Sequence, residues 1–229
     1  MDRHRRIEPR FACIAACMGD PTRARMLGAL LDGARLPAGE IARAASVNPS
    51  TASAHLAKLA QEGLVAVEAQ GRHRYFRLAD ADVARALEAL ATVAERSRPD
   101  DKWLRDPYRP LKAARTCYRH LAGELGVRVH DTLVHGGRLV ASANGYVATE
   151  AGRTWLQRVG IDADAVLRGD RYAFACLDWS ERRDHLAGRL ATALLDHFMA
   201  RHWLVREGDS RALTLTPEGR RSLLPQLQG

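Results

Sequence analysis

Apolar residues recur at three- and four-residue steps through the first hundred residues, and this spacing predicts a series of helices. The expected helices span residues 8–18, 21–32, 38–45, 49–62 and 81–96. Asp20 and Asn48 each stand just before a proline, an arrangement typical of a capped first helical turn. Gly63 is expected to end the fourth helix.

The pattern changes between the last two of these helices. Residues 64–68 and 73–78 are predicted to form strands, and Gln70-Gly71-Arg72 is predicted to form the tight turn that joins them. Four helices, a hairpin and a closing helix follow the order of a winged helix-turn-helix. In that fold one helix enters the major groove of DNA while the hairpin follows the backbone.

A second domain is expected after a break in the helical pattern. Residues 97–110 contain three prolines, which prevent a continuous helix. We therefore predict a DNA-binding and dimerisation domain at 1–97, a linker at 98–110 and a C-terminal domain at 111–229.

The C-terminal domain contains an internal repeat. The matching motifs are HLAGEL at 120–125 with HLAGRL at 185–190, and TEAGR at 149–153 with TPEGR at 216–220. Each copy, about 117–158 and 182–224, is expected to form a helix, a hairpin and a short helix. The predicted fold class is mainly α with small β-hairpins (α+β): a winged helix-turn-helix plus two repeated helix–hairpin–helix units.

Charge and hydropathy narrow the class of protein. Lys and Arg number 35 against 27 Asp and Glu, for a net charge of +8. This excess favours a polyanionic partner, because neutralised phosphates release counterions. Apolar stretches reach about ten residues, short of the ~20 that cross a bilayer, and the start MDRHRR leads into no apolar segment. We expect a cytoplasmic protein with no membrane partner.

The helix expected at 49–62 carries candidate DNA-reading chemistry. Its first half is small and hydrogen-bonding, and no acid precedes Glu62. The candidates for phosphate and base contacts are Ser50, Thr51, Ser53, His55 and Lys58 on this helix and Arg72 and Arg74 on the hairpin. A surface helix beside a solvated basic loop is the alternative reading.

Residues 18–78 resemble the ArsR/SmtB family of bacterial repressors. The resemblance rests on MGDPTRARML at 18–27, PSTASAHLAK at 49–58, EGLV at 62–65 and GRHRY at 71–75. With the closing helix it covers about 80–90 residues. It implies a homodimer formed by the first and last helices of the domain, bound to an inverted-repeat operator in double-stranded DNA. It also implies DNA contacts at the seven residues just named.

The chain departs from the metal sites of that family. Residues 40–45 hold no Cys-x-Cys pair, and residues 80–97 hold no histidine. Cys13 and Cys17 are four residues apart and are expected to share a helix face, as core residues, soft-metal ligands or a redox pair. The segment LDWSERR at 177–183 resembles the recurrent core of a C-terminal domain attached to some ArsR-type regulators, and that resemblance supplies no ligand.

The C-terminal domain offers a candidate metal site at Cys117, His120, Cys176 and His185. Two thiolates and two imidazoles suit zinc or another thiophilic metal in tetrahedral geometry. A reactive sensor thiol and plain structural packing remain alternatives. In the repeat, His120 matches His185 and Cys117 falls opposite Arg182, so the thiol is interpreted as lying outside the repeated pattern.

A small-molecule effector pocket between the repeats is a further hypothesis. Its candidate lining is aromatic: Trp155, Tyr172, Phe174, Trp179 and Trp203. The same side chains would serve equally as core.

We expect a sequence-specific DNA-binding transcriptional regulator, a homodimeric repressor released by a small molecule, a metal or a redox signal. An enzyme is not expected, because the chain has no phosphate-cradling glycine loop, no Gly-x-Ser-x-Gly and no His-Glu-x-x-His. The alternatives are a protein-interaction module on a winged-helix scaffold and a Cys/His-dependent enzyme.

Overall fold

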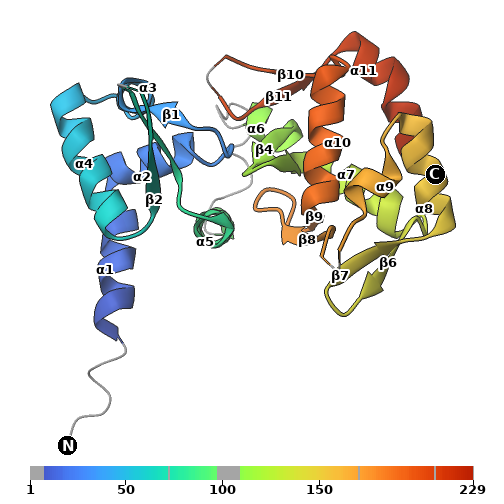
Figure 1. The fold of residues 1–229 in the computed structure, drawn as a ribbon, viewed down its shortest axis with the longest axis horizontal. Helices are drawn as coiled ribbons and strands as arrows, with labels where there is room; N and C mark the ends of the chain where they lie inside the picture. The colour runs from blue at the N-terminus through green and yellow to red at the C-terminus, as the bar shows by residue number, and fades with distance from the viewer. Residues whose placement is uncertain (1–7, 72, 97–108, 170, 209, 229) are drawn as a thin grey trace, which may run out of the picture. The chain divides into compact units, whose positions relative to one another are not determined.

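The computed structural model describes residues 8–71, 73–96, 109–169, 171–208 and 210–228. The chain divides into two compact units, residues 1–84 and residues 85–229 (Figure 1). The sequence predicts a boundary after the closing helix, at residue 97. In the structure the division falls inside that helix, after Ala84. The predicted linker 98–110 lies mostly outside the described residues. Within the described ranges, no helix combines the length and the apolar character that a membrane span requires.

The first unit contains the predicted helices. They are α1 (Glu8–Met18), α2 (Pro21–Ala29), α3 (Ala38–Ala44) and α4 (Pro49–Gln61). The two predicted caps are confirmed: the Asp20 carboxylate accepts a hydrogen bond from the backbone N–H of Arg23, and the Asn48 side chain accepts one from Thr51. Helix α2 ends earlier than predicted, with Leu30 as its C-cap.

The predicted hairpin is present and gains a third strand. Strand β2 (Val65–Gln70) pairs antiparallel with β3 (His73–Leu78). Strand β1 (Leu36–Pro37), which the sequence analysis missed, pairs with the other edge of β3 and places Leu36 opposite Phe76. Because β1 leads directly into α3, this pairing attaches the hairpin to the helices.

Helix α5 (Ala81–Arg96) does not bury its apolar stripe. Glu88 and Thr92 are buried, whereas Leu90 and Val93 are 52% and 56% exposed. The pattern of an amphipathic helix predicts the reverse, with the apolar positions inside. Glu88, which belongs to the second unit, is held inside by two arginines of the same unit, which are described with the site below.

The second unit shows the same succession of elements twice. The first set is a hairpin of β4 (Arg115–Cys117) and β5 (His120–Ala122), α7 (Gly123–Val134), a hairpin of β6 (Leu139–Ser142) and β7 (Gly145–Ala148), and α8 (Glu150–Val159). The second is a hairpin of β8 (Phe174–Leu177) and β9 (Asp184–Ala187), α10 (Arg189–Ala200), a hairpin of β10 (Leu204–Arg206) and β11 (Leu213–Leu215), and α11 (Pro217–Ser222). That they arose by duplication stays a prediction.

Three shorter elements complete the second unit. They are α6 (Arg109–Ala113), α9 (Ala163–Val166) and a closing 3-10 helix at Leu224–Leu227. One apolar core draws on both sets of elements, and Leu133, Trp155, Leu190 and Phe198 are buried in it. The two halves of the unit therefore fold around a common centre.

The repeated HLAG motif forms a strand end and a helix start, not the helical turn that the sequence predicts. His120 lies on β5 and His185 on β9; α7 begins at the glycine of the first motif and α10 directly after the glycine of the second. Gly123 and Gly188 have φ of +78° and +95°, which side chains rarely adopt. A Cβ on Gly123 would also lie 2.5 Å from the carbonyl oxygen of Lys112. Glycine is therefore required where the chain turns from strand into helix.

The second repeated motif caps the short helices. Thr149 and Thr216 accept hydrogen bonds from the backbone N–H groups of Gly152 and Gly219, three residues further on. A Cβ on either glycine would collide with a carbonyl oxygen of the chain segment just before the preceding hairpin. The Thr-x-x-Gly spacing thus caps each helix and holds it against its hairpin.

Candidate functional site

The predicted DNA-reading residues of α4 lie on its outer face. Ser50, Ser53 and Lys58 are exposed, and Thr51 and His55 are half-buried. The opposite face is buried through Ala52, Leu56 and Leu59. The Ser50 hydroxyl donates to the Asn48 side chain at 2.7 Å and the Ser53 hydroxyl to the Pro49 carbonyl at 2.9 Å. These hydroxyls therefore keep acceptor capacity toward a partner outside the molecule.

His55 and Lys58 of α4 lie close to charged side chains of the same chain. Nδ1 of His55 lies 3.5 Å from Nη1 of Arg23 and 3.9 Å from Oδ1 of Asp20. Nζ of Lys58 lies 2.6 Å from Glu62, and the hydrogen bond and charge of Glu62 raise the pKa of Lys58. An exposed ion pair of this kind is weak, so Lys58 is free to exchange Glu62 for a phosphate.

The hairpin presents its charge unevenly. Arg74 is exposed, with its guanidinium carbon 5.9 Å from the centre of the Phe76 ring. Arg72 lies outside the described residues. Glu68 is held by Arg77 at 2.6 Å and by Arg35 at 3.0 Å, and these hydrogen bonds lower its pKa. The acid of this hairpin is thus neutralised by neighbouring arginines.

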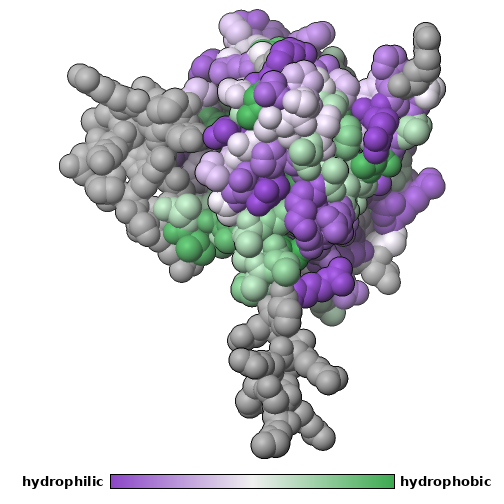
Figure 2. Space-filling view, turned by 90° about the vertical axis from the view of Figure 1, so that its left-hand side faces the viewer, coloured by the Kyte–Doolittle hydropathy of each residue, from purple (hydrophilic) through white to green (hydrophobic). Residues whose placement is uncertain are grey.

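Figure 2 turns the elements on the left of Figure 1, α4 among them, toward the viewer. The face is largely hydrophilic in its upper part, and hydrophobic side chains gather lower down. Hydrophilic surface suits contact with a wet, charged partner such as DNA. Hydrophobic surface suits contact with another protein surface.

Four side chains of the second unit converge inside it. Strand register places Cys117 opposite His120 in the β4–β5 hairpin and Cys176 opposite His185 in the β8–β9 hairpin. The ligand atoms of all four lie within 4.8 Å of one another. The Nε2 atoms of the two histidines are 3.0 Å apart. The structure therefore brings together all four residues of the predicted metal site, here called the Cys/His cluster.

The interpretation that the thiols lie outside the repeat was wrong. Alignment at a constant spacing places Cys117 opposite Arg182, but strand pairing makes it the counterpart of Cys176. Two residues separate the cysteine from its histidine in the first hairpin and eight in the second. The different loop lengths concealed the equivalence. A search for a cysteine followed by a histidine across each hairpin would have found it.

Burial and mutual contacts decide the protonation of the Cys/His cluster. A hydrogen bond from Cys117 holds the pKa of Cys176 well below its usual value, and that bond and burial raise the pKa of Cys117. Burial lowers the pKa of His120. Burial opposes the charged form of His185 too, but Asp178 and Cys176 outweigh it and raise its pKa to about 9. A thiolate on Cys176 thus faces an imidazolium on His185.

The Asp178 carboxylate holds the Cys/His cluster from behind. Its Oδ2 lies 3.0 Å from Nδ1 of His185 and accepts a hydrogen bond of 2.7 Å from the backbone N–H of Gly123. Its Oδ1 lies 3.0 Å from Nη2 of Arg115. Burial would raise the pKa of Asp178, but contacts with His185 and Arg115 hold it well below its usual value. The carboxylate is therefore ionised inside the protein.

Arg115 extends this contact network to α5. The side chain is fully buried, and its guanidinium carbon lies 4.5 Å from the centre of the Trp179 ring. Its Nη2 is 3.5 Å from Oε2 of Glu88, and Nη1 of Arg211 is 2.9 Å from the other oxygen of Glu88. Two carboxylates and two guanidinium groups thus alternate from the β8–β9 loop to α5.

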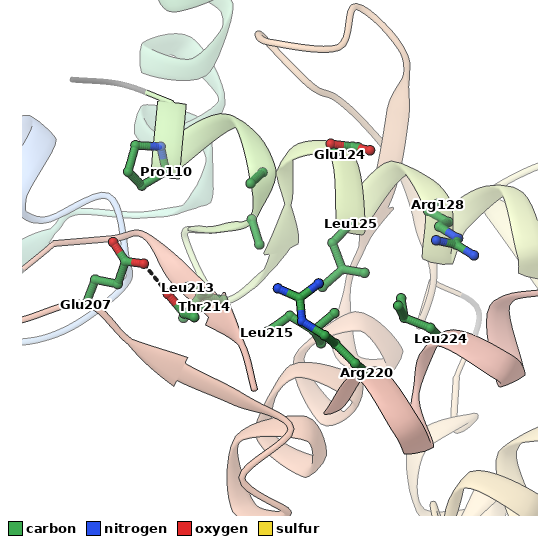
Figure 3. A pocket seen from close by; sticks show the side chains of 12 residues that line it. Pro110, Glu124, Leu125, Arg128, Glu207, Leu213, Thr214, Leu215, Arg220 and Leu224 are labelled. Carbon is green, nitrogen blue, oxygen red and sulfur yellow. Dashed lines mark hydrogen bonds between the residues drawn. The ribbon is translucent and has the colours of Figure 1, made fainter. Parts of the chain in front are cut away.

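A surface pocket of about 310 Å³ lies elsewhere in the second unit (Figure 3). Leu125 and Leu215 form part of its apolar lining, and Arg128 and Arg220 bring positive charge to it. None of the five aromatic residues proposed as a pocket lining belongs to its wall. Trp155, Tyr172 and Trp179 are buried, and Trp203 stacks on Phe198.

The cysteines of α1 do not form a shared exposed pair. Cys13 is exposed and Cys17 is buried. Burial raises the pKa of Cys17 above its usual value, against the charge of Arg23. The thiol of Cys17 therefore belongs to the apolar packing of the first unit.

Known proteins that are similar to this chain share a helix-turn-helix description. Residues 18–68 match the family described as a helix-turn-helix domain. The uncharacterised HTH-type transcriptional regulator YdfF of Bacillus subtilis is 40% identical over 216 residues, which cover 93% of this chain and 95% of that protein. This chain belongs to the ArsR-type helix-turn-helix transcriptional regulators.

Two further relatives match the regulator over shorter lengths. The HTH-type transcriptional regulator CmtR of Mycobacterium tuberculosis is 41% identical over 86 residues, 38% of this chain and 72% of that protein. The solved homodimeric winged helix-turn-helix domain of Mb0332 from Mycobacterium bovis is 29% identical and covers 43% of this chain and 91% of that domain, with a TM-score of 0.40. The match to YdfF, which spans nearly the whole of both chains, shows that this chain is a helix-turn-helix transcriptional regulator.

We predict that Asp178→Ala lowers the free energy of unfolding of this regulator by about 3–5 kcal/mol, because it leaves the Arg115 charge buried without its closest carboxylate. Denaturant unfolding in the presence of a chelator measures the effect. The matched control is Asp164→Ala, whose carboxylate is 90% exposed beside Arg153 and whose loss is expected to cost below about 1 kcal/mol. Equal effects of the two substitutions would contradict the prediction.

Proposed function

We propose that this ArsR-type regulator is a homodimeric repressor, which occupies an inverted-repeat operator and leaves it when an effector binds the second unit. The observation that carries the proposal is the outer face of α4. This face presents hydroxyl groups in its first half, while the apolar side of the helix is buried. The hairpin adds exposed positive charge at Arg74.

The proposed DNA contacts follow from helix chemistry. Ser50, Thr51 and Ser53 lie at the N-terminal end of α4, where side chains can reach phosphates and base edges, and where backbone N–H groups and the helix dipole favour phosphate. His55 and Lys58 lie further along the same helix toward base edges and backbone. Arg72 and Arg74 are proposed as hairpin contacts with phosphates. His55 is expected to contribute least to base reading, since it is half-buried beside Asp20 and Arg23.

Exposed apolar side chains support a homodimer. Phe11 on α1 is 78% exposed, and Leu90 and Val93 on α5 are more than half exposed. Large apolar side chains that a helix leaves uncovered are typical of protein contact surfaces. Two winged helices on one duplex also add their binding energies and read half-sites at a set spacing.

The second unit is proposed to receive the signal. Its two sets of hairpin, helix, hairpin and helix are proposed to be structural repeats, each supplying one Cys–His pair. Three classes of effector remain: a small molecule, for which the pocket beside Arg128 and Arg220 is the candidate, a redox signal and a metal. The convergence of two thiols and two imidazoles favours a thiophilic metal ion such as zinc.

For the hairpin, we predict that Arg74→Ala weakens binding to every duplex and lowers the slope of log affinity against log salt by about 1, because one phosphate contact is lost. Arg72→Ala is expected to act in the same way. Fluorescence anisotropy across a salt series measures the slope. Arg153→Ala, on α8 of the second unit, is the control that should not change it. An unchanged slope in Arg74→Ala would exclude this hairpin contact.

For α4, Ser53→Ala is expected to change the ratio of affinities between the operator and base-substituted operators, while the salt slope stays as in the parent protein. The reason is that base edges, not phosphates, carry sequence information. Competition binding against a library of substituted operators measures the ratio. Ser142→Ala, at an exposed position of the β6–β7 hairpin, serves as control. If Ser53→Ala leaves every ratio unchanged, Ser53 does not read a base.

For the dimer, Leu90→Asp combined with Val93→Asp should give a protein that sediments with the mass of one chain. Binding to the inverted repeat should then fall by roughly 100-fold or more, because the second half-site contact is no longer intramolecular. Binding to a single half-site should persist. Val140→Asp, exposed to 44% on β6, is the control. A double variant that still sediments as a dimer would place the interface elsewhere.

A further inference from the structure

We propose that Cys117, His120, Cys176 and His185 form a tetrahedral binding site for a thiophilic divalent cation of the zinc class. Each of two hairpins supplies one sulfur and one nitrogen ligand across its own strand pair. The metal site does not depend on the proposed repressor function. That its occupancy regulates DNA binding does rest on that function.

The separation of the ligand atoms fits such an ion. Metal–sulfur distances of ~2.3 Å and metal–nitrogen distances of ~2.0–2.1 Å give tetrahedral edges of about 3.3–3.8 Å. All four ligand atoms lie within 4.8 Å of one another, and the two Nε2 atoms are 3.0 Å apart. The two nitrogens would have to separate slightly, and no pair of ligand atoms exceeds a tetrahedral edge by more than about 1.5 Å.

The donor set selects the class of cation. Two cysteine sulfurs and two imidazole nitrogens suit zinc and its softer neighbours, whereas calcium and magnesium take oxygen ligands. The nearest carboxylate, Asp178, contacts Nδ1 of His185 and so lies behind the imidazole, not among the ligands. The Cys/His cluster thus contains no oxygen donor that would favour a hard cation.

The surroundings orient one ligand for this task. Nδ1 of His185 faces Asp178, while its Nε2 faces the cluster. A carboxylate at one ring nitrogen keeps the proton there and directs the lone pair of the other nitrogen to a metal. Asp178 is itself held by the backbone N–H of Gly123 and by Arg115. The ring orientation is therefore maintained by groups that the fold already positions.

The Cys/His cluster is built for a closed site. His185 is fully buried, Cys117 and His120 are 2% and 8% exposed, and Cys176 is half-buried. Four protein ligands fill a tetrahedral shell and leave no position for a substrate, which is typical of structural zinc. The bound ion would link the β4–β5 hairpin to the β8–β9 hairpin.

The test is metal binding by the full-length chain, purified under reducing conditions and stripped with a chelator. Titration with Co²⁺ should give thiolate charge-transfer absorption and the visible bands of tetrahedral cobalt, saturating at one ion per chain. Zn²⁺ should then displace the cobalt. Cys117→Ser and Cys176→Ser should each remove part of the charge-transfer absorption and weaken zinc binding. Cys13→Ser, at an exposed position on α1, should change neither.

A second measurement covers variants that fail to fold. In the zinc-loaded parent protein, titration with an organic mercurial should release one zinc as two thiols react. Failure to bind either metal, with all thiols free, would overturn the proposal in favour of a buried histidine–histidine contact. A chain isolated with Cys117 and Cys176 in a disulfide, and unable to bind metal after reduction, would overturn it as well. An octahedral cobalt spectrum would exclude this ligand set.

DNA affinity, measured separately with and without one equivalent of zinc, distinguishes this proposal from the repressor proposal. If the protein binds metal in tetrahedral geometry but has no affinity for duplex DNA, the metal-site proposal is supported and the repressor proposal is excluded. Duplex binding that zinc does not change leaves both the site and DNA binding in place and excludes regulation by this ion.

Discussion

The second unit depends on the burial of the Asp178 carboxylate. An ionised carboxylate removed from water is costly unless opposite charge and hydrogen-bond donors surround it. Arg115, His185 and the backbone N–H groups of Gly123 and Ser180 supply those partners. Because these partners lie on β4, β9, the start of α7 and the β8–β9 loop, one charge sets the relative positions of four segments. The same carboxylate contacts Nδ1 of His185 and so leaves Nε2 facing the Cys/His cluster. The contact between Asp178 and His185 therefore stabilises the fold and also orients a proposed ligand.

The two hairpins that carry the Cys/His cluster are related by structure more than by sequence. In both, a cysteine faces a histidine across the strand pair, and a glycine with positive φ starts the following helix three residues after that histidine. Two such hairpins bring four donors to one point, where either hydrogen bonds or a cation must satisfy buried nitrogen and sulfur atoms. The loop of the second hairpin is longer because it contains Asp178 and Trp179, which hold Arg115. The longer β8–β9 loop, in which the two hairpins differ, therefore supplies the residues that support the two equivalent Cys–His pairs.

Features that depend on residues close together in the sequence could be predicted. The caps at Asp20 and Asn48, the hairpin at 64–78 and the small polar face of α4 follow from residue types a few positions apart, and the structure confirms these elements. The sequence also named the four residues of the Cys/His cluster by their chemistry. It did not predict β1 or the hairpins β4–β5 and β8–β9, because strands of two to four residues show too little periodicity to detect. It also missed the buried position of Glu88, because Arg115 and Arg211, which neutralise this carboxylate, are distant in sequence.

In helix α5, ion pairs bury a glutamate and leave apolar side chains exposed. Hydrophobic burial would normally turn Leu90 and Val93 toward the second unit, and Glu88 toward water. The ion pairs of Glu88 with Arg115 and Arg211 reverse this orientation. A charged contact is directional, so it holds the rotation of the helix while the apolar side chains stay outside for a partner chain. Arg115 also contacts Asp178 behind His185, so three successive contacts join His185 of the Cys/His cluster to Glu88 of α5. The chain of buried charges thus connects the proposed metal site with the proposed dimer surface, without requiring any change in the hydrophobic core.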